Sequence, residues 1–210
     1  MTQPVPWPKV KRPLVAILRG VKPDEVEGIV ETLIDTGFEM IEVPLNSPDP
    51  FDSIARICKR FGKETWIGAG TVLTADDCAR VADVGGRLMV SPNVDVDVLA
   101  MAARRGMVTM PGVFSPTEAF LALRSGAAAL KFFPASILGP SGIAAIRAVL
   151  PKDAVIGAVG GVSDKNFADY IAAGIQAFGL GSSLYKPGMS VAEVRATAQA
   201  SVVAYDRAVS

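Results

Sequence analysis

The sequence "GAAALKFFPAS" (residues 126–136) places one lysine, Lys131, in an otherwise apolar run. A fully buried lysine is rare, because its ammonium group loses hydration in an apolar interior. Either the run lets the lysine reach solvent, or the protein holds the lysine inside for a purpose. The rest of the sequence decides between these two interpretations.

Seven other short apolar runs have the composition of strands, and segments with helical periodicity separate them. The predicted strands are residues 14–20, 40–45, 66–72, 88–92, 108–113, 129–136, 155–161 and 177–183. The predicted helices are residues 23–36, 50–61, 75–84, 95–105, 116–125, 141–150, 164–173 and 190–205. Eight strand–helix units with continuously apolar strands predict an α/β fold, a closed parallel (β/α)8 TIM barrel. An open doubly wound sheet also alternates strands and helices and stays open as the alternative.

The chain has 210 residues, which is enough for one substantial core but short for two domains. We expect a single barrel domain at residues 14–210 and a short proline-rich N-terminal extension at residues 1–13. The extension lacks the apolar segment of a secretory signal, and no apolar run approaches the length of a membrane span. The sequence therefore predicts a soluble cytoplasmic protein with no membrane partner.

The composition excludes several classes of function. Lysine plus arginine equals aspartate plus glutamate at 21 each, so no net charge favours a nucleic acid as partner. Histidine is absent, which removes the commonest general base and the commonest zinc ligand. Cys58 and Cys78 lie in helical segments without the spacing of a metal or redox site, and we interpret them as packing thiols in a reducing compartment.

Strand periodicity predicts which side chains face the interior of the barrel. If Leu130 and Phe132 point outward to the helices, Lys131 points inward, and the same alternation turns Glu42 inward on the second strand. TIM-barrel active sites lie at the carboxyl ends of the strands, so Lys131 and Glu42 are predicted to converge on one enclosed space there. A buried ion pair that only stabilises the core is the alternative for these two residues.

Two further polar residues stand at strand ends, Arg19 on the first strand and Thr71 on the third. Arg19 supplies a second cation and Thr71 a hydroxyl group. A capping or interdomain salt bridge is the alternative role for Arg19, and threonine is an ordinary strand residue.

An enclosed lysine has a definite chemistry. Desolvation and a neighbouring Arg19 both disfavour the ammonium form, which lowers the pKa of the amine and makes it a nucleophile toward carbonyl groups. The resulting protonated imine withdraws electrons from the adjacent bond, and Glu42 can move the proton that carbon–carbon cleavage requires. The lysine itself is then the electron sink, so we expect neither a metal nor an organic cofactor.

Glycine-rich loops follow the last two strands. Gly160 and Gly161 follow the seventh strand, and Gly181, Ser182 and Ser183 follow the eighth. TIM barrels frequently bind phosphate in these loops through backbone amides, so we predict a phosphate site there. Tight turns without a ligand are the alternative. "GAG" at residues 68–70 lacks the third glycine of a dinucleotide-binding motif.

These motifs together resemble the class I 2-keto-3-deoxy-6-phospho sugar acid aldolases, the KDPG and KDPGal aldolases, over almost the whole chain. The segments that carry the resemblance are "AILRG", "IEVPLNSP", "IGAGTVL", "VSPN", "MPGVFSPTEA", "LKFFPAS", "AVGGV" and "GLGSSLY". The resemblance implies a Schiff-base lysine at Lys131 and a general acid–base residue at Glu42. It also implies that Arg19 and Thr71 hold the substrate carboxylate, and that Phe133 and Pro92 form walls of the pocket.

The resemblance also implies a substrate, a phosphorylated keto sugar acid, and a homotrimer. Gluconate-type members tend to have "EVTLR" and "PTGG" where this chain has "EVPLN" and "AVGG", so Asn46 and Val159 indicate the galactonate type. Valine in place of threonine at position 159 removes a hydroxyl that could bond the C4 oxygen of one epimer. Activity on the gluconate epimer or on both epimers, a phosphosugar isomerase or synthase, and a non-catalytic sugar-phosphate sensor remain alternatives.

Overall fold

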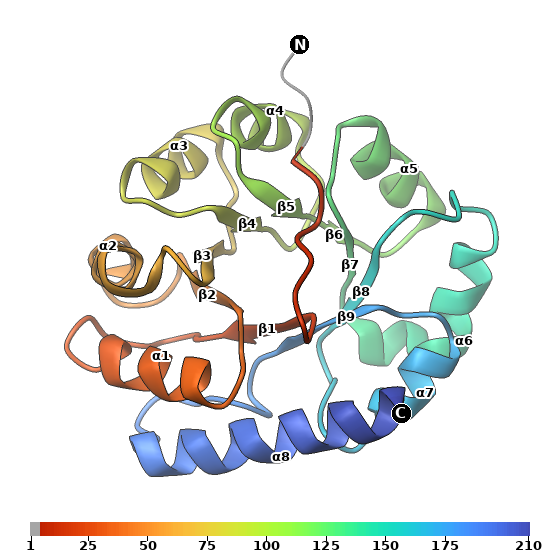
Figure 1. The fold of residues 1–210 in the computed structure, drawn as a ribbon. Coiled ribbons are helices and arrows are strands. Elements are labelled where there is room, and N and C mark those ends of the chain that lie inside the picture. The colour runs from red at the N-terminus through yellow and green to blue at the C-terminus, as the bar shows by residue number, and fades with distance from the viewer. Residues whose placement is uncertain (1–4) are drawn as a thin grey trace.

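Nine parallel strands and eight helices alternate along residues 5–210, which are the residues that the computed structural model describes (Figure 1). The strands are β1 (Leu14–Ile17), β2 (Met40–Pro44), β3 (Trp66–Gly70), β4 (Leu88–Val90), β5 (Val108–Met110), β6 (Gly112–Val113), β7 (Leu130–Phe132), β8 (Ile156–Val159) and β9 (Ala177–Leu180). The helices are α1 (Val26–Asp35), α2 (Pro50–Phe61), α3 (Ala75–Asp83), α4 (Val96–Arg104), α5 (Pro116–Arg124), α6 (Ala135–Arg147), α7 (Phe167–Ala172) and α8 (Val191–Val209). The predicted TIM barrel is thus confirmed.

The barrel closes where β5 and β6 follow each other in the chain. The strand order is β5-β4-β3-β2-β1-β9-β8-β7-β6, so the two ends of the sheet meet at Pro111. Residues 108–113 were predicted as one strand, but proline has no N–H group, and the ladder is interrupted there. The amides of Ala129 and Lys131 donate to the carbonyls of Thr109 and Pro111, at 3.1 and 2.9 Å, which joins β7 to this segment. This closure excludes the open doubly wound sheet.

Side chains alternate between two apolar layers. Outward-facing residues such as Leu130, Phe132 and Ile41 pack against the ring of helices. Inward-facing residues fill the barrel, and these are Val15, Ile17, Met40, Leu88, Val90, Val108, Met110, Ala129, Val159 and Ala177. The predicted inward and outward faces of the strands are therefore confirmed.

The prediction was wrong where the lysine-bearing strand ends. The predicted strand continued to residue 136, and the next helix was expected only at residue 141. The strand instead ends at Phe132, and α6 begins at Ala135, because Pro134 cannot donate to a ladder and stands at the N-cap. Gly139 has a φ of +66° and kinks α6. The kink lies just before residue 141, where the helix was predicted to begin. The helix therefore starts close to the carboxyl end of the strand.

The helices predicted at residues 75–84 and 116–125 are confirmed as α3 and α5, and side chains cap the start of each. The Thr74 hydroxyl accepts a hydrogen bond from the amide of Asp77, and Ser115 forms a capping box with Glu118. The helix predicted at residues 164–173 begins later, since residues 163–166 form a turn and α7 begins at Phe167.

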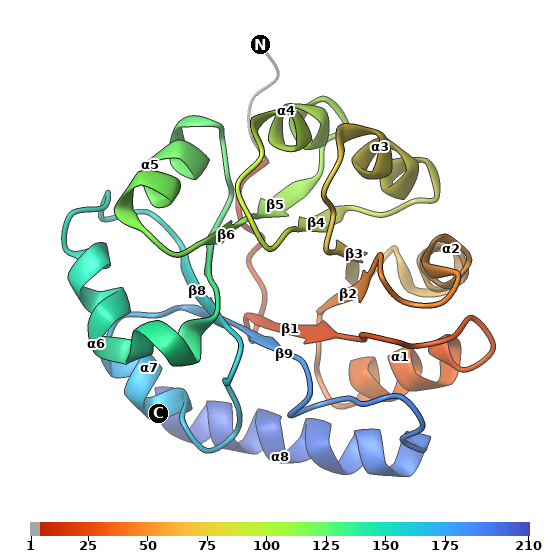
Figure 2. The ribbon, with the colours of Figure 1, turned by 180° about the vertical axis from the view of Figure 1, so that it is seen from behind.

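The extension before β1 closes one end of the barrel. Its first four residues lie outside the described part of the chain, and the remainder crosses the centre of the ring of strands (Figure 1). Val5, Trp7 and Val10 pack against the apolar residues of the barrel interior. Seen from the opposite side, the extension lies behind the ring, so the other end of the barrel is not covered by it (Figure 2).

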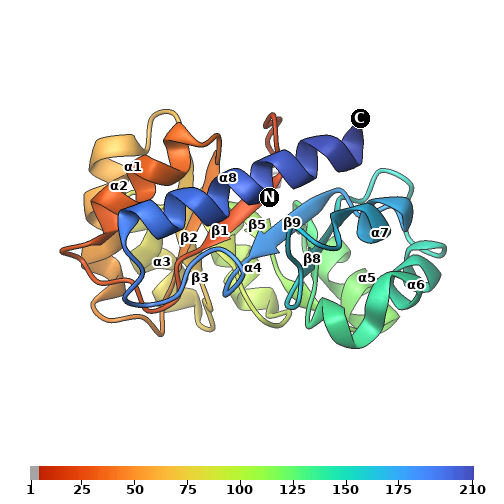
Figure 3. The same ribbon diagram turned by 90° about the horizontal axis from the view of Figure 1, so that it is seen from below.

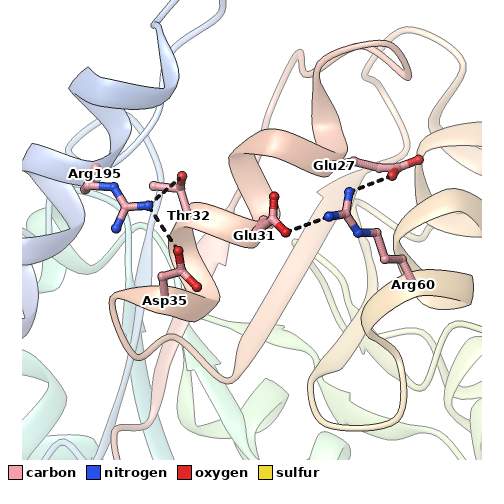
Figure 4. Close-up of polar contacts among 6 residues, drawn as sticks. All are labelled: Glu27, Glu31, Thr32, Asp35, Arg60 and Arg195. Carbon is pink, nitrogen blue, oxygen red and sulfur yellow. Dashed lines mark hydrogen bonds and ion pairs between the residues drawn. The ribbon is translucent and has the colours of Figure 1, made fainter.

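The last helix holds the outer layer together. α8 lies along one side of the barrel and packs against α1 and α7 (Figure 3). Arg195 of α8 donates to Asp35 and Thr32 of α1 (Figure 4). Arg60 of α2 forms ion pairs with Glu27 and Glu31, which also lie on α1. These pairs are exposed to solvent, so each contributes about 1 kcal/mol or less, and burial of the apolar layer supplies most of the stability. Among residues 5–210, no helix combines the length and apolar character that a membrane crossing needs.

We predict that Trp7→Ala lowers the free energy of unfolding by about 2 kcal/mol, because it removes a half-buried ring from the floor of the barrel. Urea denaturation measures the change. Lys9→Ala, at an exposed position of the same extension, is the control and should change stability by about 0.5 kcal/mol or less. Equal effects of the two substitutions would show that the extension does not close the barrel.

Candidate active site

A cavity of about 350 Å³ lies at the carboxyl ends of the strands. All twelve residues predicted for the site line it, and they are Arg19, Glu42, Thr71, Pro92, Lys131, Phe133, Val159, Gly160, Gly161, Gly181, Ser182 and Ser183. These residues come from strands or loops separated by up to 164 positions in the chain, from Arg19 to Ser183. The fold thus brings the predicted residues into one space, as TIM barrels do with their strand ends.

Lys131 comes from β7 and is almost completely buried, with 6% of its surface exposed. Its Nζ atom lies 4.8 Å from the centre of the Phe133 ring, within the range of a cation–π contact. Burial lowers the pKa of the Lys131 amine, the nearby Glu42 carboxylate opposes that shift, and Arg19 lowers the pKa further. The site therefore favours the neutral, nucleophilic form of the amine.

Glu42 comes from β2 and is 2% exposed. Its Oε2 atom has no hydrogen-bond partner within residues 5–210. Burial raises the pKa of Glu42 to about 7, although Lys131 and Arg19 act in the opposite direction. A carboxyl group with a pKa near neutrality can both donate and accept a proton at physiological pH.

A glycine on the neighbouring strand makes room for the Glu42 carboxyl group. Glu42 pairs with Gly68 across the β2–β3 ladder, and Gly70 follows two residues later on the same face. A Cβ atom on Gly70 would overlap the Glu42 carboxyl group. The "GAG" segment thus has a packing role beside the candidate acid–base residue.

Arg19 and Thr71 lie at the rim of the cavity. Arg19 is exposed, and its Nη1 atom donates to Oδ1 of Asn46. Thr71 is partly buried and has a φ of +56°, in the left-handed region that β-branched residues seldom adopt. Such backbone strain is typical of functional sites, where the surrounding structure holds a residue in place.

The glycine loop after β8 approaches the start of α6 and is joined to the loop after β9. Gly160 and Gly161 have φ values of +91° and +80°, which only glycine adopts without strain. A Cβ atom on Gly161 would lie 2.5 Å from the Cβ atom of Ser136, so glycine permits the close approach of α6. The Ser183 hydroxyl donates to the carbonyl of Val162 at 3.0 Å and joins the two loops. Backbone amides and a helix start at one end of the cavity suit an anionic group such as phosphate.

Four residues of the lining were not predicted, and they are Ile17, Val162, Ser163 and Gly179. Ser163 lies directly before the helix predicted at residues 164–173. Gly179 faces Val159, whose Cγ2 atom would lie 2.6 Å from a Cβ atom at position 179, so the glycine leaves room for this valine. Gly179 lies opposite Val159 because β8 and β9 pair in that register. The register would have identified Gly179 as a lining residue, but the sequence does not give strand register.

Comparison with known proteins gives the family of the chain. KDPG and KHG aldolases match residues 9–204 of the chain. A probable 2-dehydro-3-deoxy-6-phosphogalactonate aldolase of Rhizobium meliloti strain 1021 is 65% identical over 202 residues, which cover 96% of this chain and 95% of that protein. The 2-dehydro-3-deoxy-6-phosphogalactonate aldolase of Escherichia coli K12 is 47% identical over 96% of this chain and 98% of its own length.

The chain belongs to the KDPG and KHG aldolase family.

Solved structures also match this aldolase. One described as native KDPGal has a TM-score of 0.95 and 46% identity, and the match covers 97% of this chain and 98% of the other. A KDPG aldolase from Legionella pneumophila, with pyruvate captured as a covalent carbinolamine intermediate, has a TM-score of 0.82 and 25% identity over 91% and 95% of the two chains. The whole cavity lies within the part of the aldolase that the family covers.

The aldolase has no cluster of three or more histidine, cysteine or acidic side chains with metal-site geometry among residues 5–210. Cys58 and Cys78 are both free. Burial raises the pKa of each thiol to about 11, and neither residue lines the cavity.

We predict that Glu42→Gln makes the stability of this aldolase less dependent on pH. The folded protein holds the Glu42 proton up to about pH 7, whereas the unfolded chain releases it near the ordinary value of 4.5. The wild type therefore loses stability as the pH rises between these values, by up to about 3 kcal/mol, and the glutamine variant avoids that loss.

Urea denaturation of both proteins from pH 5 to pH 8 measures the difference. Glu64→Gln, at an exposed position, controls for the removal of one carboxylate. A difference between wild type and Glu42→Gln that stays constant over this range would contradict the raised pKa.

Proposed function

We propose that this aldolase is a class I enzyme that cleaves 2-dehydro-3-deoxy-6-phosphogalactonate to pyruvate and D-glyceraldehyde 3-phosphate through a Schiff base on Lys131. The observation that carries the proposal is a buried lysine and a buried glutamate in one barrel cavity, where the Oε2 atom of Glu42 has no hydrogen-bond partner within residues 5–210. The covalent pyruvate adduct of the Legionella pneumophila enzyme supports the Schiff-base chemistry. The names of the relatives from Rhizobium meliloti and Escherichia coli support the galactonate substrate.

Lys131 begins the proposed reaction. Its neutral amine attacks the C2 ketone to give a carbinolamine, and loss of water leaves a protonated imine. Arg19 and Thr71 orient the C1 carboxylate, so that the ketone meets the amine at the correct angle. Pro92 and Phe133 form apolar walls around the bond that changes.

Glu42 moves the protons. Through a water molecule, its carboxylate takes the proton of the C4 hydroxyl group while the C3–C4 electron pair flows into the imine. Glyceraldehyde 3-phosphate departs and leaves an enamine, and Glu42 returns a proton to C3. Addition of water then releases pyruvate and restores the amine. The imine nitrogen is the electron sink, so the proposed cycle uses no metal or organic cofactor.

The glycine loops hold the phosphate in this proposal. Gly160, Gly161 and Gly181 offer backbone amides, and Ser182 and Ser183 lie beside them. Because backbone amides carry no full charge, the product phosphate is held without a strong ion pair that would slow its release.

Two features beyond the reaction itself are part of the proposal. We propose a homotrimer in the cytoplasm. Exposed apolar side chains of Leu73, Phe114 and Ile137, which follow β3, β6 and β7, give a surface that a second copy could cover. The free thiols of Cys58 and Cys78 agree with a reducing compartment.

We predict that incubation with pyruvate and cyanoborohydride adds a reduced pyruvyl group to Lys131, and peptide mass spectrometry locates it. Lys131→Met should fold with an unchanged circular dichroism spectrum, form no adduct, and lose cleavage by about 10⁴-fold or more. Pyruvate release without any adduct would indicate a non-covalent mechanism. Substrate binding without turnover would indicate a sensor.

We predict faster cleavage of the galactonate epimer than of the gluconate epimer, measured as kcat/KM with each pure substrate. Val159→Thr should shift the ratio toward the gluconate epimer by about fivefold to tenfold, because the added hydroxyl can bond the C4 oxygen of that epimer. Thermal unfolding of the variant controls for packing, since the two side chains have nearly the same shape. A variant ratio equal to that of the wild type would exclude Val159 as the discriminating residue.

A further inference from the structure

The segment "PLNS", residues 44–47, forms a tight turn directly after β2. The amide of Ser47 donates to the carbonyl of Pro44 at 2.9 Å, which is the hydrogen bond of a β-turn. Asn46 is therefore held at the third position of the turn and Ser47 at the fourth. Asn46 is exposed, whereas Ser47 is buried.

This turn and the strand before it hold the backbone on both sides of Arg19. The amide of Leu18 donates to the carbonyl of Glu42 at 3.0 Å, and the amide of Gly20 donates to the hydroxyl of Ser47 at 2.9 Å. Gly20 has a φ of +83°, and Pro187 packs against it so closely that a Cβ atom would lie 2.6 Å from its Cγ atom. The chain around Arg19 therefore has a defined position, although Arg19 is exposed.

Asn46 holds the side chain of Arg19 as well. Its Oδ1 atom accepts a hydrogen bond from Nη1 of the guanidinium group. Within residues 5–210, Nη1 makes the only side-chain hydrogen bond of Arg19, which leaves the edge formed by Nε and Nη2 for a carboxylate. Arg12 uses that same edge on Asp206, with both N–O distances at 2.7 Å, so this binding mode occurs elsewhere in the chain.

The partner of Arg19 is neutral, and this matters for an anionic ligand. Within residues 5–210, Arg19 takes part in none of the ion pairs. An amide oxygen orients the guanidinium and leaves its charge unneutralised. An aspartate at the same place would orient it equally well but would compete with the substrate for the charge.

We propose that the Pro44–Ser47 turn is a positioning element for substrate recognition, in which Asn46 directs the Arg19 guanidinium toward the carboxylate of the keto acid. The inference rests on the proposed function, since it assigns a role within that same site. Asn46 acts through Arg19 and is a positioning residue. Ser47 fixes the main chain from which Arg19 extends.

A double-mutant cycle between Asn46 and Arg19 tests the proposal, with steady-state cleavage of the phosphorylated keto acid as the assay. Asn46→Ala should raise KM by about tenfold and change kcat by about twofold or less, because it weakens a contact made equally in ground and transition states. In an Arg19→Met background the same substitution should have almost no further effect on kcat/KM. Gln199→Ala, at an exposed position of α8, is the matched amide control and should leave both constants unchanged.

Asn46→Asp separates positioning from simple support of the fold. A purely structural hydrogen bond would be restored by the aspartate oxygen, so KM would return to the wild-type value. Competition for the Arg19 charge instead predicts a KM at least as high as that of Asn46→Ala.

Two results would overturn the inference in a wild type that cleaves the substrate. One is an unchanged KM in Asn46→Ala. The other is a loss of kcat/KM on Asn46→Ala that is equally large in the wild-type and the Arg19→Met backgrounds. A wild type that neither cleaves the keto acid nor forms a pyruvate adduct would refute the proposed function and this inference together.

Discussion

The burial of an amine and a carboxyl group in one closed barrel is the constraint on which the rest of the structure depends. Lys131 and Glu42 are both removed from water, and burial is the largest influence on the pKa of each. Burial shifts both groups toward their neutral forms, which costs stability in the folded protein near neutral pH. The large apolar layer between barrel and helices offsets this cost. The same burial gives the amine and the carboxyl group the pKa shifts on which the proposed chemistry relies.

Closure of the barrel and the small residues inside it create the space in which these two groups meet. Pro111 interrupts the ladder between β5 and β6, the two ends of the sheet. Hydrogen bonds from the amides of Ala129 and Lys131 to this segment close the barrel. Gly70 admits the Glu42 carboxyl group and Gly179 admits Val159. The extension before β1 covers the end of the barrel opposite to the loops that line the cavity. The packing of the barrel interior therefore also sets the shape of the cavity.

Periodicity alone predicted the inward side of β7 and β2, because alternation along a strand depends on nothing beyond the backbone. It failed at Pro111 and at Pro134, where proline removed a donor and ended a strand earlier than the apolar run suggested. The lining residues Gly179 and Ser163 were missed for another reason. Strand register and the path of a loop decide which atoms face a cavity, and neither leaves a local pattern in the sequence.

The sequence by itself determined the fold class, the family and the residue types of the chemistry. Local periodicity, turn residues and the absence of histidine are properties of neighbouring positions and composition. Only the tertiary structure decided the environment of each group. The burial of Glu42, the strained backbone of Thr71 and the contact between Asn46 and Arg19 each depend on segments that meet through strand pairing. Desolvation and hydrogen-bond direction are properties of the assembled barrel, because they depend on which atoms exclude water from a site.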